Sequence, residues 1–550
     1  MAQGVAGAEP ASASAGLLSR DRIVAQAGFN RWLIPPCALA THLCIGMAYG
    51  FSVFWLPLSK SIGISKSVAC PAGAGLMQAL TTTSCDWSVS QLTLTYSLFF
   101  VVLGSASAIW GGWLERAGPR KAGIVAAICW CGGMVLGAIG VIMHQLWLLW
   151  LGAGLIGGIG LGIGYITPVS TLIKWFPDKR GMATGMAIMG FGGGAMIGSP
   201  LADMLMKHFT SATQVGAWQT LMVLAAGYFL FMIGGAFSFR VPPPHWTPEG
   251  WTAPAKAVKG VSAFNVHLKD AHKTPQFWLI WTVLLLNVSA SIGIIGVASP
   301  MIQQIFGGHL IGAPTVDFAH LDKGQAAMTA TVAAGFVGLL SLFNIGGRFF
   351  WATASDYIGR KTTYAVMLAL GAFLFGAIAT WSASAAILAA FVASFCITTS
   401  MYGGGFSTVP AYLSDVFGTQ YVGAIHGRLL TAWSTAGILG PYILGGVQDR
   451  YKAAKGAVSA ASIYQPVFLL LAGLLVAGFL LNLLVKPVSD RWHMTGEEAK
   501  VAIAESHGSS GIGRGRIDGM TLAAWAVVGI PLLWGVWVTL TKAVTLFHQG

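Results

Sequence analysis

Charged residues are scarce in this sequence. Asp, Glu, Lys and Arg make up 9% of its 550 residues, whereas soluble domains carry about 25%. Hydrophobic residues make up 55%, and the mean hydropathy is +0.70. This balance excludes an ordinary soluble protein. It indicates an all-α integral membrane protein, and the surrounding partner we expect is the lipid bilayer.

The motifs of common enzyme classes are also missing. The sequence contains no HExxH, no Walker A loop, no nucleophile elbow and no cluster of metal-ligating residues. The glycine spacings in GGIGLGIG (157–164) partly match a dinucleotide-binding motif. Because the stretch follows no strand and lies in an apolar run, it does not indicate a dinucleotide site. The net charge of +13 comes from basic residues between apolar runs, so it does not indicate nucleic-acid binding. We therefore expect no enzyme activity, no cofactor and no metal site.

Long apolar runs are abundant instead. Twelve runs can cross roughly 30 Å of hydrocarbon, and a thirteenth follows near the C-terminus. The first residues lack the apolar core of a signal peptide and are expected to form a mostly disordered cytoplasmic tail. TGEE in the last linker predicts a short helix there. In chain order we expect a tail (1–30), a first six-helix bundle (31–239), a cytoplasmic loop (240–275), a second six-helix bundle (276–486), a cytoplasmic linker (487–518) and an extra transmembrane helix (519–545).

Lys and Arg indicate the orientation. Most of those outside the apolar runs lie in the N-terminal tail and in loops on the same side of the membrane, which favours a cytoplasmic N-terminus in the inner membrane of a bacterium. Cys70 and Cys85 share one polar loop, which this orientation places outside the cell. A disulfide between them and a pair of free thiols are both open. The other five cysteines lie in apolar runs and are expected to pack there.

The two halves of the chain repeat each other. WGGWLERAGPRK (110–121) aligns with WATASDYIGRK (351–361), and FPDKRGMATGMAIMGFGGGAMIG (176–198) aligns with FGTQYVGAIHGRLLTAWSTAGILG (417–440). Both pairs are separated by the same 241–242 residues. Two independent motifs with one offset indicate a duplicated six-helix unit.

These features resemble the major facilitator superfamily over about 31–486. Within it, KWFPDKRGMATG (174–185) and the segment around Arg348 resemble the oxalate/formate antiporter family. The resemblance implies two six-helix bundles around a central cavity, each made of inverted three-helix repeats. It also implies a substrate site near the membrane midplane and alternating access by rocking of the bundles.

The resemblance also implies a charged latch at the cytoplasmic helix ends. An acid pairs with basic loop residues and with a neighbouring helix end in one state, and releases them in the other. A role in topology alone is the alternative. The latch residues are Glu115, Arg116, Arg120 and Lys121 in the first half and Asp356, Arg360 and Lys361 in the second.

Arg348 is a charge that the repeat does not explain, because its counterpart is Ser107. It lies eight residues before Asp356, about 12 Å along a helix and near the midplane. A charge there costs at least about 2.5–3.5 kcal/mol. No Asp or Glu lies at a comparable depth, so we expect its partner to be a bound anion. A guanidinium that snorkels to the interface is the alternative.

Trp433 bears on the identity of that anion. The resemblance implies a lysine at this position in members that carry oxalate, whereas this sequence reads TAWS. One cation and an indole suit a monoanion with a small apolar part. We therefore expect a monocarboxylate such as formate, lactate, pyruvate or another short hydroxy or keto acid.

Aromatic residues are expected to close the cavity. Tyr402 and Phe406 match an aromatic pair of the family, and Tyr49 and Tyr165 lie in helices that line such cavities. Ordinary packing is the alternative for each. His42 lies in the middle of the first helix, where it could couple proton movement to anion movement.

The function expected from these observations is secondary transport of small carboxylate anions by a functional monomer, by antiport or linked to protons. The same fold transporting another solute, such as a nitrate-like anion or a neutral metabolite, remains open. So does a membrane sensor that transports nothing.

Overall fold

The computed structural model describes residues 16–18, 21–26, 28–64, 67–68, 70, 76–243, 246–251, 264–312, 316, 318–380, 385–439, 459–495 and 518–544. In this part of the chain the secondary structure is helical, apart from two isolated bridges and a two-stranded hairpin of β1 (Thr210–Ser211) and β2 (Gln214–Val215). Helices satisfy their own backbone hydrogen bonds, which an apolar surrounding requires.

The first half of the chain forms one bundle. The 3-10 helix η1 (Asp21–Ile23) precedes it. The first span consists of η2 (Arg31–Leu33), α1 (Ile34–Ile45), η3 (Gly46–Phe54) and α2 (Trp55–Leu58). The remaining helices are α3 (Leu76–Thr81), α4 (Val89–Ala117), α5 (Pro119–Ile142), α6 (Leu146–Leu149), the π-helix η4 (Trp150–Ile156), α7 (Gly157–Trp175), α8 (Arg180–Phe209) and α9 (Ala217–Ser238).

The second half forms the other bundle. Its helices are α10 (Leu268–Ala271), α11 (Pro275–Phe306), η5 (His309–Ile311), η6 (Phe318–His320), α12 (Lys323–Ile358), α13 (Arg360–Thr380), α14 (Ala385–Phe417), α15 (Val422–Leu429), α17 (Ala460–Leu484) and η7 (Asp490–Trp492). The extra helix, α19 (Gly519–Val544), follows.

Twelve helices of the described residues are long and apolar enough to span a membrane. They include α19, the predicted thirteenth helix. The span that begins with α15 is only partly described: it is helical over α15, turns at Leu430 and is helical again over 431–439. The short helix predicted from TGEE lies outside the described residues.

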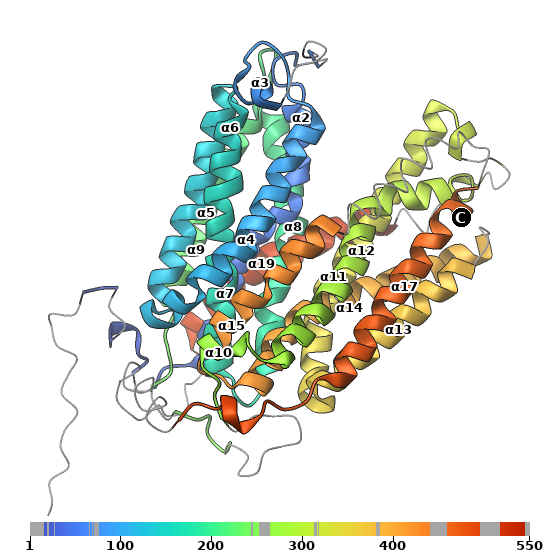
Figure 1. The fold of residues 1–550 in the computed structure, drawn as a ribbon. Coiled ribbons are helices and arrows are strands. Elements are labelled where there is room, and N and C mark those ends of the chain that lie inside the picture. Colours follow the sequence, from blue (N-terminus) through green and yellow to red (C-terminus); the bar gives the residue numbers. More distant parts are fainter. Residues whose placement is uncertain are drawn as a thin grey trace, which may run out of the picture.

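The two bundles lie close together at one end and diverge toward the other (Figure 1). They meet where α8 packs against α12 and α14, and where α15 packs against α4 and α7. The repeat is visible in these contacts. A Cβ on Gly185 would lie 2.9 Å from the carbonyl oxygen of Arg348, and one on Gly427 would lie 2.3 Å from that of Ser107. The two glycines therefore allow the same close backbone approach at equivalent places in the two halves.

The N-terminal tail, the segment after α9 and the linker after α17 gather at the end where the bundles meet, which we call the tail end. The described part of the tail pairs with the inter-bundle segment there, and most of the predicted tail lies outside the described residues. The N–H of Ala25 donates to the carbonyl of Val241 at 3.0 Å, and the N–H of Val241 donates to the carbonyl of Ile23 at 2.9 Å. Sequence patterns do not reveal this backbone pairing with the inter-bundle segment.

The opposite end carries the loop between the first two spans, and we call it the disulfide end. Cys70 and Cys85 are joined there, with their Cα atoms 5.0 Å apart. The neighbouring carboxylate of Asp86 accepts hydrogen bonds from the N–H groups of Ile62 and Val68, at 2.7 and 2.8 Å. The bonded pair and this carboxylate together organise the loop.

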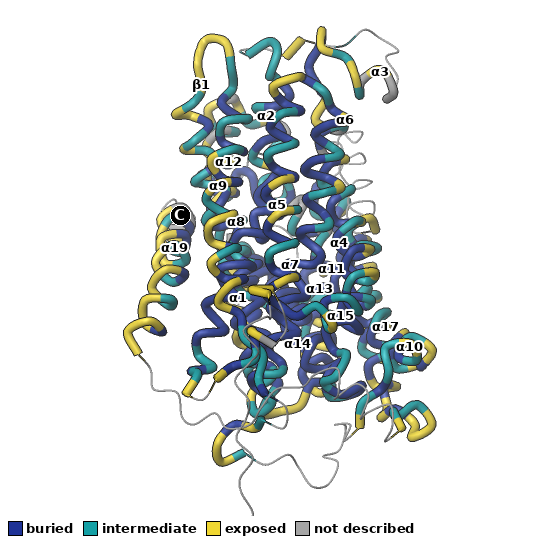
Figure 2. Tube along the Cα trace, turned by 90° about the vertical axis from the view of Figure 1, so that its left-hand side faces the viewer, coloured by how far each residue is buried: buried dark blue, intermediate teal, exposed yellow. Residues whose placement is uncertain are grey.

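The extra helix α19 lies at the edge of the molecule, with much of its surface exposed (Figure 2). It packs against α1 and α8 of the first bundle and against α12 of the second. Trp525 donates its indole N–H to the carbonyl of Trp32 at 3.1 Å. The helix therefore touches both bundles.

Candidate functional site

Arg348 lies on α12, and only 1% of its surface is exposed. Its Nε donates to the side-chain oxygen of Asn344, one turn earlier, at 2.9 Å. Its Nη1 donates to the carbonyl of Ile188 on α8 at 3.2 Å. The guanidinium therefore points between the bundles.

The described residues provide no acid that pairs with Arg348. Among the described residues, none of the ion pairs involves Arg348. Its Nη2 is buried and has no hydrogen-bond partner in the part of the chain that the structure describes. The rings of Phe191 and Phe406 lie 5.9 and 5.8 Å from the guanidinium carbon and provide only cation–π attraction. A buried cation with a free donor is therefore available for a bound acceptor.

Trp433 lies at the centre of an aromatic cluster beside Arg348. Its ring centroid is 4.6 Å from that of Phe406 and 5.5 Å from that of Tyr165. The indole N–H of Trp433 and the hydroxyl of Tyr165 are buried without a hydrogen-bond partner in the described residues. The other rings packed against Trp433 are Tyr49, Phe100 and Phe191.

Tyr49 and Tyr402 connect the two bundles. Their hydroxyl oxygens are 3.3 Å apart, although the residues lie on α1–η3 and α14. Tyr402 also packs edge-on against Phe406, with centroids 5.3 Å apart. The structure thus brings together all six residues that the sequence proposed for substrate binding: Arg348, Tyr49, Tyr165, Tyr402, Phe406 and Trp433.

Two histidines flank this cluster, and both are fully buried. The ring of His42 stacks on Tyr165 with centroids 5.3 Å apart, and each of its nitrogens faces a backbone carbonyl. His426 lies on the other side of Tyr165, with centroids 5.9 Å apart, and neither of its nitrogens has a hydrogen-bond partner in the described residues.

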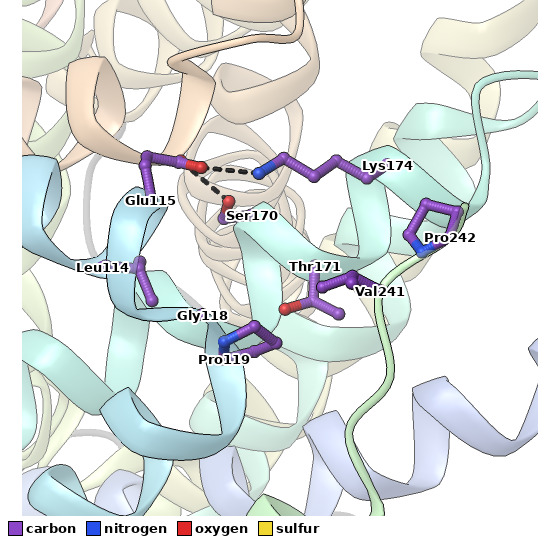
Figure 3. A pocket seen from close by; sticks show the side chains of 9 residues that line it. All are labelled: Leu114, Glu115, Gly118, Pro119, Ser170, Thr171, Lys174, Val241 and Pro242. Atoms are coloured by element: carbon purple, nitrogen blue, oxygen red, sulfur yellow. Dashed lines mark hydrogen bonds and ion pairs between the residues drawn. The ribbon is translucent and has the colours of Figure 1, made fainter. Parts of the chain in front are cut away.

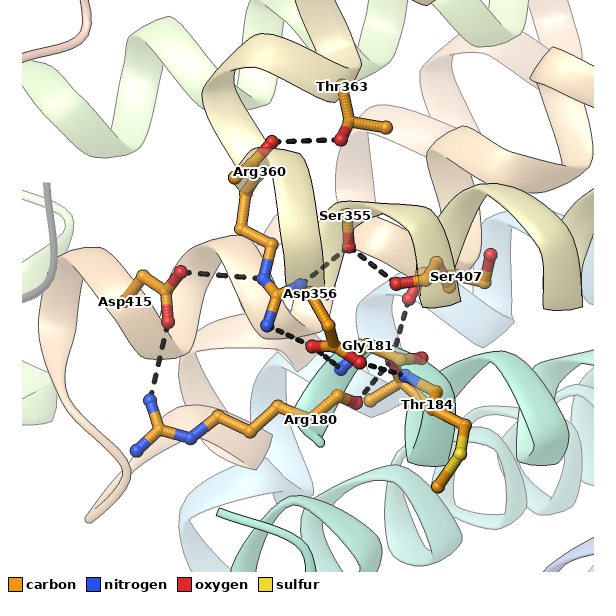
Figure 4. A network of polar contacts seen from close by, with 12 residues as sticks. Arg180, Gly181, Thr184, Ser355, Asp356, Arg360, Thr363, Ser407 and Asp415 are labelled. Atoms are coloured by element: carbon orange, nitrogen blue, oxygen red, sulfur yellow. Dashed lines mark hydrogen bonds and ion pairs between the residues drawn. The ribbon is translucent and has the colours of Figure 1, made fainter. Parts of the chain in front are cut away.

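The second-half latch joins the bundles at the tail end (Figure 4). The carboxylate of Asp356 accepts hydrogen bonds from the N–H groups of Gly181 and Met182, at 2.9 and 2.8 Å. These groups belong to the first turn of α8, where the helix dipole favours an anion. Arg360 donates to the same carboxylate. An acid of the second bundle therefore caps a helix of the first.

Asp415 extends this network from α14. Its carboxylate is 3.3 Å from Nη1 of Arg180 and 3.4 Å from Nε of Arg360. The pair with Arg180 again links the two bundles. Neither Asp415 nor Arg180 was predicted from the sequence as a latch residue, although Arg180 lies in the stretch KWFPDKRGMATG.

The first-half latch is different, as Figure 3 shows. Glu115 pairs with Lys174 and accepts a hydrogen bond from the hydroxyl of Ser170 at 2.9 Å, beside a small cavity between α4, α7 and the segment at Val241. These partners all belong to the first half. Lys174 is equivalent to Asp415 in the second half, so the two repeats carry opposite charges at this position.

Four of the predicted latch residues do not join either acid. Arg116 and Lys121 are exposed. Arg120 donates to the carbonyls of Leu17 and Phe237, and Lys361 donates to those of Leu483 and Val485. Because these long side chains start at a helix end, their direction depends on nearby free carbonyls rather than on spacing to the acid. Arg120 therefore contacts the tail and α9, and Lys361 contacts the end of α17.

Three residues of the site were missed by the sequence analysis. Asn344 could have been found, because it lies one helical turn before Arg348. Phe100 and Phe191 carried no such signal, because an aromatic residue in an apolar run looks the same whether it faces lipid, a neighbouring helix or a site.

Comparisons with known proteins agree with this fold. A sequence model of the Major Facilitator Superfamily matches residues 67–441. The oxalate:formate antiporter of Oxalobacter formigenes is 27% identical over 417 residues, covering 75% of this chain and 83% of the antiporter. Apicoplast pyruvate carrier 1 of Toxoplasma gondii is 24% identical over 340 residues, covering 54% of this chain and 58% of the carrier.

Solved structures show the same architecture. The crystal structure of the fucose:proton symporter FucP of E. coli has a TM-score of 0.53 against this chain, at 13% identity, and covers 84% of this chain and 100% of the symporter. At this level of identity the similarity concerns the fold alone.

Proposed function

Since the chain belongs to the Major Facilitator Superfamily, we propose that this membrane transporter is a secondary carrier of small monocarboxylate anions. The observation that carries the proposal is Arg348, a guanidinium buried to 1% exposure whose Nη2 has no partner and which no carboxylate of the described residues balances. A carboxylate accepts hydrogen bonds from a guanidinium and neutralises its charge.

The surroundings of Arg348 favour one negative charge over two. Arg348 is bordered by Phe191 and Phe406, and the Trp433 indole packs against both rings. A second carboxylate would lose its hydration there without a second fixed cation. Formate and pyruvate, which appear in the names of two relatives, each carry a single negative charge.

The free donors near Arg348 also favour a substrate with more than one acceptor atom. Within the described residues, the indole N–H of Trp433 and Nη2 of Arg348 are buried and form no hydrogen bond, and the hydroxyl of Tyr165 faces Arg348. A 2-oxo or 2-hydroxy acid offers a carbonyl or hydroxyl oxygen beside its carboxylate. Such a substrate would use donors from both bundles at once.

For alternating access we propose that the tail end faces the cytoplasm, in the inner membrane of a bacterium. Asp356 bound to the first turn of α8, with Arg180 bound to Asp415, then holds the cytoplasmic side closed. Opening that side requires both contacts to break, because each joins one bundle to the other.

The test is counterflow in proteoliposomes with purified protein. Vesicles loaded with unlabelled pyruvate should accumulate labelled pyruvate, and formate and lactate should compete more strongly than oxalate, nitrate or a neutral sugar. Arg348→Ala should abolish counterflow, and Arg348→Lys should restore only part of it, because a lysine cannot bind a carboxylate bidentately. Arg116→Ala is the matched control, since this arginine is exposed. Normal counterflow by Arg348→Ala would disprove the site, and stronger competition by nitrate would favour an inorganic anion.

A further inference from the structure

His42 has an unusual pair of hydrogen-bond partners. Its Nδ1 is 2.7 Å from the carbonyl oxygen of Ala187 on α8, and its Nε2 is 3.0 Å from the carbonyl oxygen of Tyr165 on α7. A neutral imidazole carries one N–H, so it can donate to only one of these carbonyls. Its other nitrogen would then present a lone pair to the lone pairs of an oxygen. The imidazolium form carries two N–H groups and satisfies both carbonyls.

The charged form also has a cost at this place. His42 is fully buried, and burial disfavours a charge that is not balanced. The titratable or charged groups facing it from other elements are Tyr165 on α7, Arg348 on α12 and His426 on α15. None of these is an acid that would balance the imidazolium, and Arg348 repels it.

Arg348 and His42 are connected through α8. Nη1 of Arg348 donates to the carbonyl of Ile188, and His42 faces the carbonyl of Ala187, the preceding residue. An anion bound to Arg348 would cancel the repulsion felt by His42. The two carbonyls would then offset the cost of burial without the added repulsion from Arg348.

We propose that His42 is a proton-binding site whose occupancy is linked to the anion at Arg348, so that one proton travels with each monocarboxylate. The inference rests on the proposed carboxylate site. A proton from the water on the open side forms the second N–H bond of the imidazole, and the same proton leaves to water on the other side when the anion leaves. The carrier thus returns empty with a neutral His42.

Thermodynamic linkage sets the direction of the effect. If the anion favours protonation of His42, protonation favours anion binding by the same factor. The affinity should therefore increase as the pH falls, by up to about tenfold per pH unit where binding takes up one whole proton. His426 is a weaker candidate for this role, because neither of its nitrogens faces an acceptor in the described residues.

The direct experiment measures proton uptake on binding. Pyruvate is added to the purified protein in weakly buffered detergent solution with a pH-indicator dye at pH 7, where pyruvate itself is fully ionised. The wild type should take up about one proton per pyruvate bound. His42→Gln should bind pyruvate with little or no uptake, and the matched control His208→Gln, an exposed histidine, should behave as the wild type. Pyruvate binding by the wild type without proton uptake, or unchanged uptake by His42→Gln, would overturn the inference.

A transport experiment separates this inference from the proposed function. An inwardly directed proton gradient should drive pyruvate accumulation by the wild type. His42→Gln should lose this accumulation but keep pyruvate–pyruvate counterflow, which also shows that the variant is folded. If the wild type binds and exchanges no carboxylate at all, the proposed function fails. If it exchanges pyruvate but shows neither proton uptake nor gradient-driven accumulation, only the role of His42 fails.

Discussion

The guanidinium of Arg348 and the imidazole of His42 bind consecutive carbonyl oxygens of α8, those of Ile188 and Ala187, at 3.2 and 2.7 Å. Arg348 comes from α12 of the second bundle and His42 from α1 of the first. The same α8 begins at the turn that Asp356 caps. One helix therefore contacts the proposed anion site, the proposed proton site and the latch that joins the bundles.

Gly192 leaves room for the side chain of Arg348. A Cβ at this position would lie 3.0 Å from Nε and 3.3 Å from Cδ of Arg348. Gly192→Ala should therefore displace the guanidinium and reduce pyruvate counterflow by at least about tenfold, which corresponds to a loss of about 1.4 kcal/mol in transition-state stabilisation.

Gly227→Ala on α9 is the matched control, because no atom lies within 4 Å of the Cβ it would add. It should retain wild-type counterflow. Equal counterflow by the two variants would show that the position of Arg348 does not depend on Gly192.

Asp356→Asn should weaken closure of the tail end. The carboxylate accepts two N–H bonds from the first turn of α8 and pairs with Arg360. Hydrogen bonds to a charged group contribute about 1.5–3 kcal/mol, so the balance between closed and open tail ends should shift by about 10- to 150-fold. The measurement is the labelling rate of a cysteine introduced at the tail end between the bundles.

Asp203→Asn provides the comparison, since Asp203 forms an exposed pair with Lys207 within one helix and, among the described residues, pairs with no other element. It should leave the labelling rate unchanged. A rate for Asp356→Asn no higher than that of this control would exclude a latch at Asp356.

Trp433→Lys should change substrate preference. Trp433 packs against Phe191 and Phe406, the two rings that border Arg348. A lysine there adds a second cation near Arg348 and removes apolar surface, so the ratio of oxalate to pyruvate counterflow should rise by about tenfold or more. Trp433→Leu, which adds no charge, should lower transport without raising this ratio. A rise with both variants would mean that size rather than charge selects the substrate.

His144 should make the disulfide end sensitive to acid. Its ring stacks on Trp87 with centroids 4.2 Å apart, and its Nε2 faces the carbonyl of Cys85 at 3.0 Å. Burial lowers the pKa of His144, against weaker opposing effects of Cys85 and Asp86. The folded loop therefore binds fewer protons than the unfolded loop. Its stabilisation is complete above about pH 6.5, the usual histidine pKa, and is lost as the pH falls from there through the lowered pKa.

Hydrogen exchange of residues 61–64 and 85–87 tests this prediction. Exchange by local opening, after correction for its intrinsic pH dependence, should become several-fold faster between pH 7.5 and 5 in the wild type. His144→Gln should show little of this pH dependence, because glutamine does not titrate. An identical profile in both proteins would assign the acid sensitivity to another group.

Local properties of the chain account for what could be predicted. Hydropathy over about twenty residues locates a membrane span wherever it packs, so the helices and the extra helix α19 followed from the sequence. The repeat placed Glu115 and Asp356 in equivalent positions. The sequence also predicted that Arg348 lies in the interior without a paired carboxylate, because acidic residues are scarce in the apolar runs.

The packing of the two bundles decided the rest. The contact of His42 with two carbonyls, the convergence of Phe191 and Phe406 on Arg348, and the capture of Asp356 by the first turn of α8 all join residues far apart in the chain. Arg116 and Lys121 match the latch pattern, yet they point to the surface. Spacing along one helix determines which face a side chain occupies, but only the neighbouring helices determine whether that face meets lipid, a carbonyl or an unpaired charge.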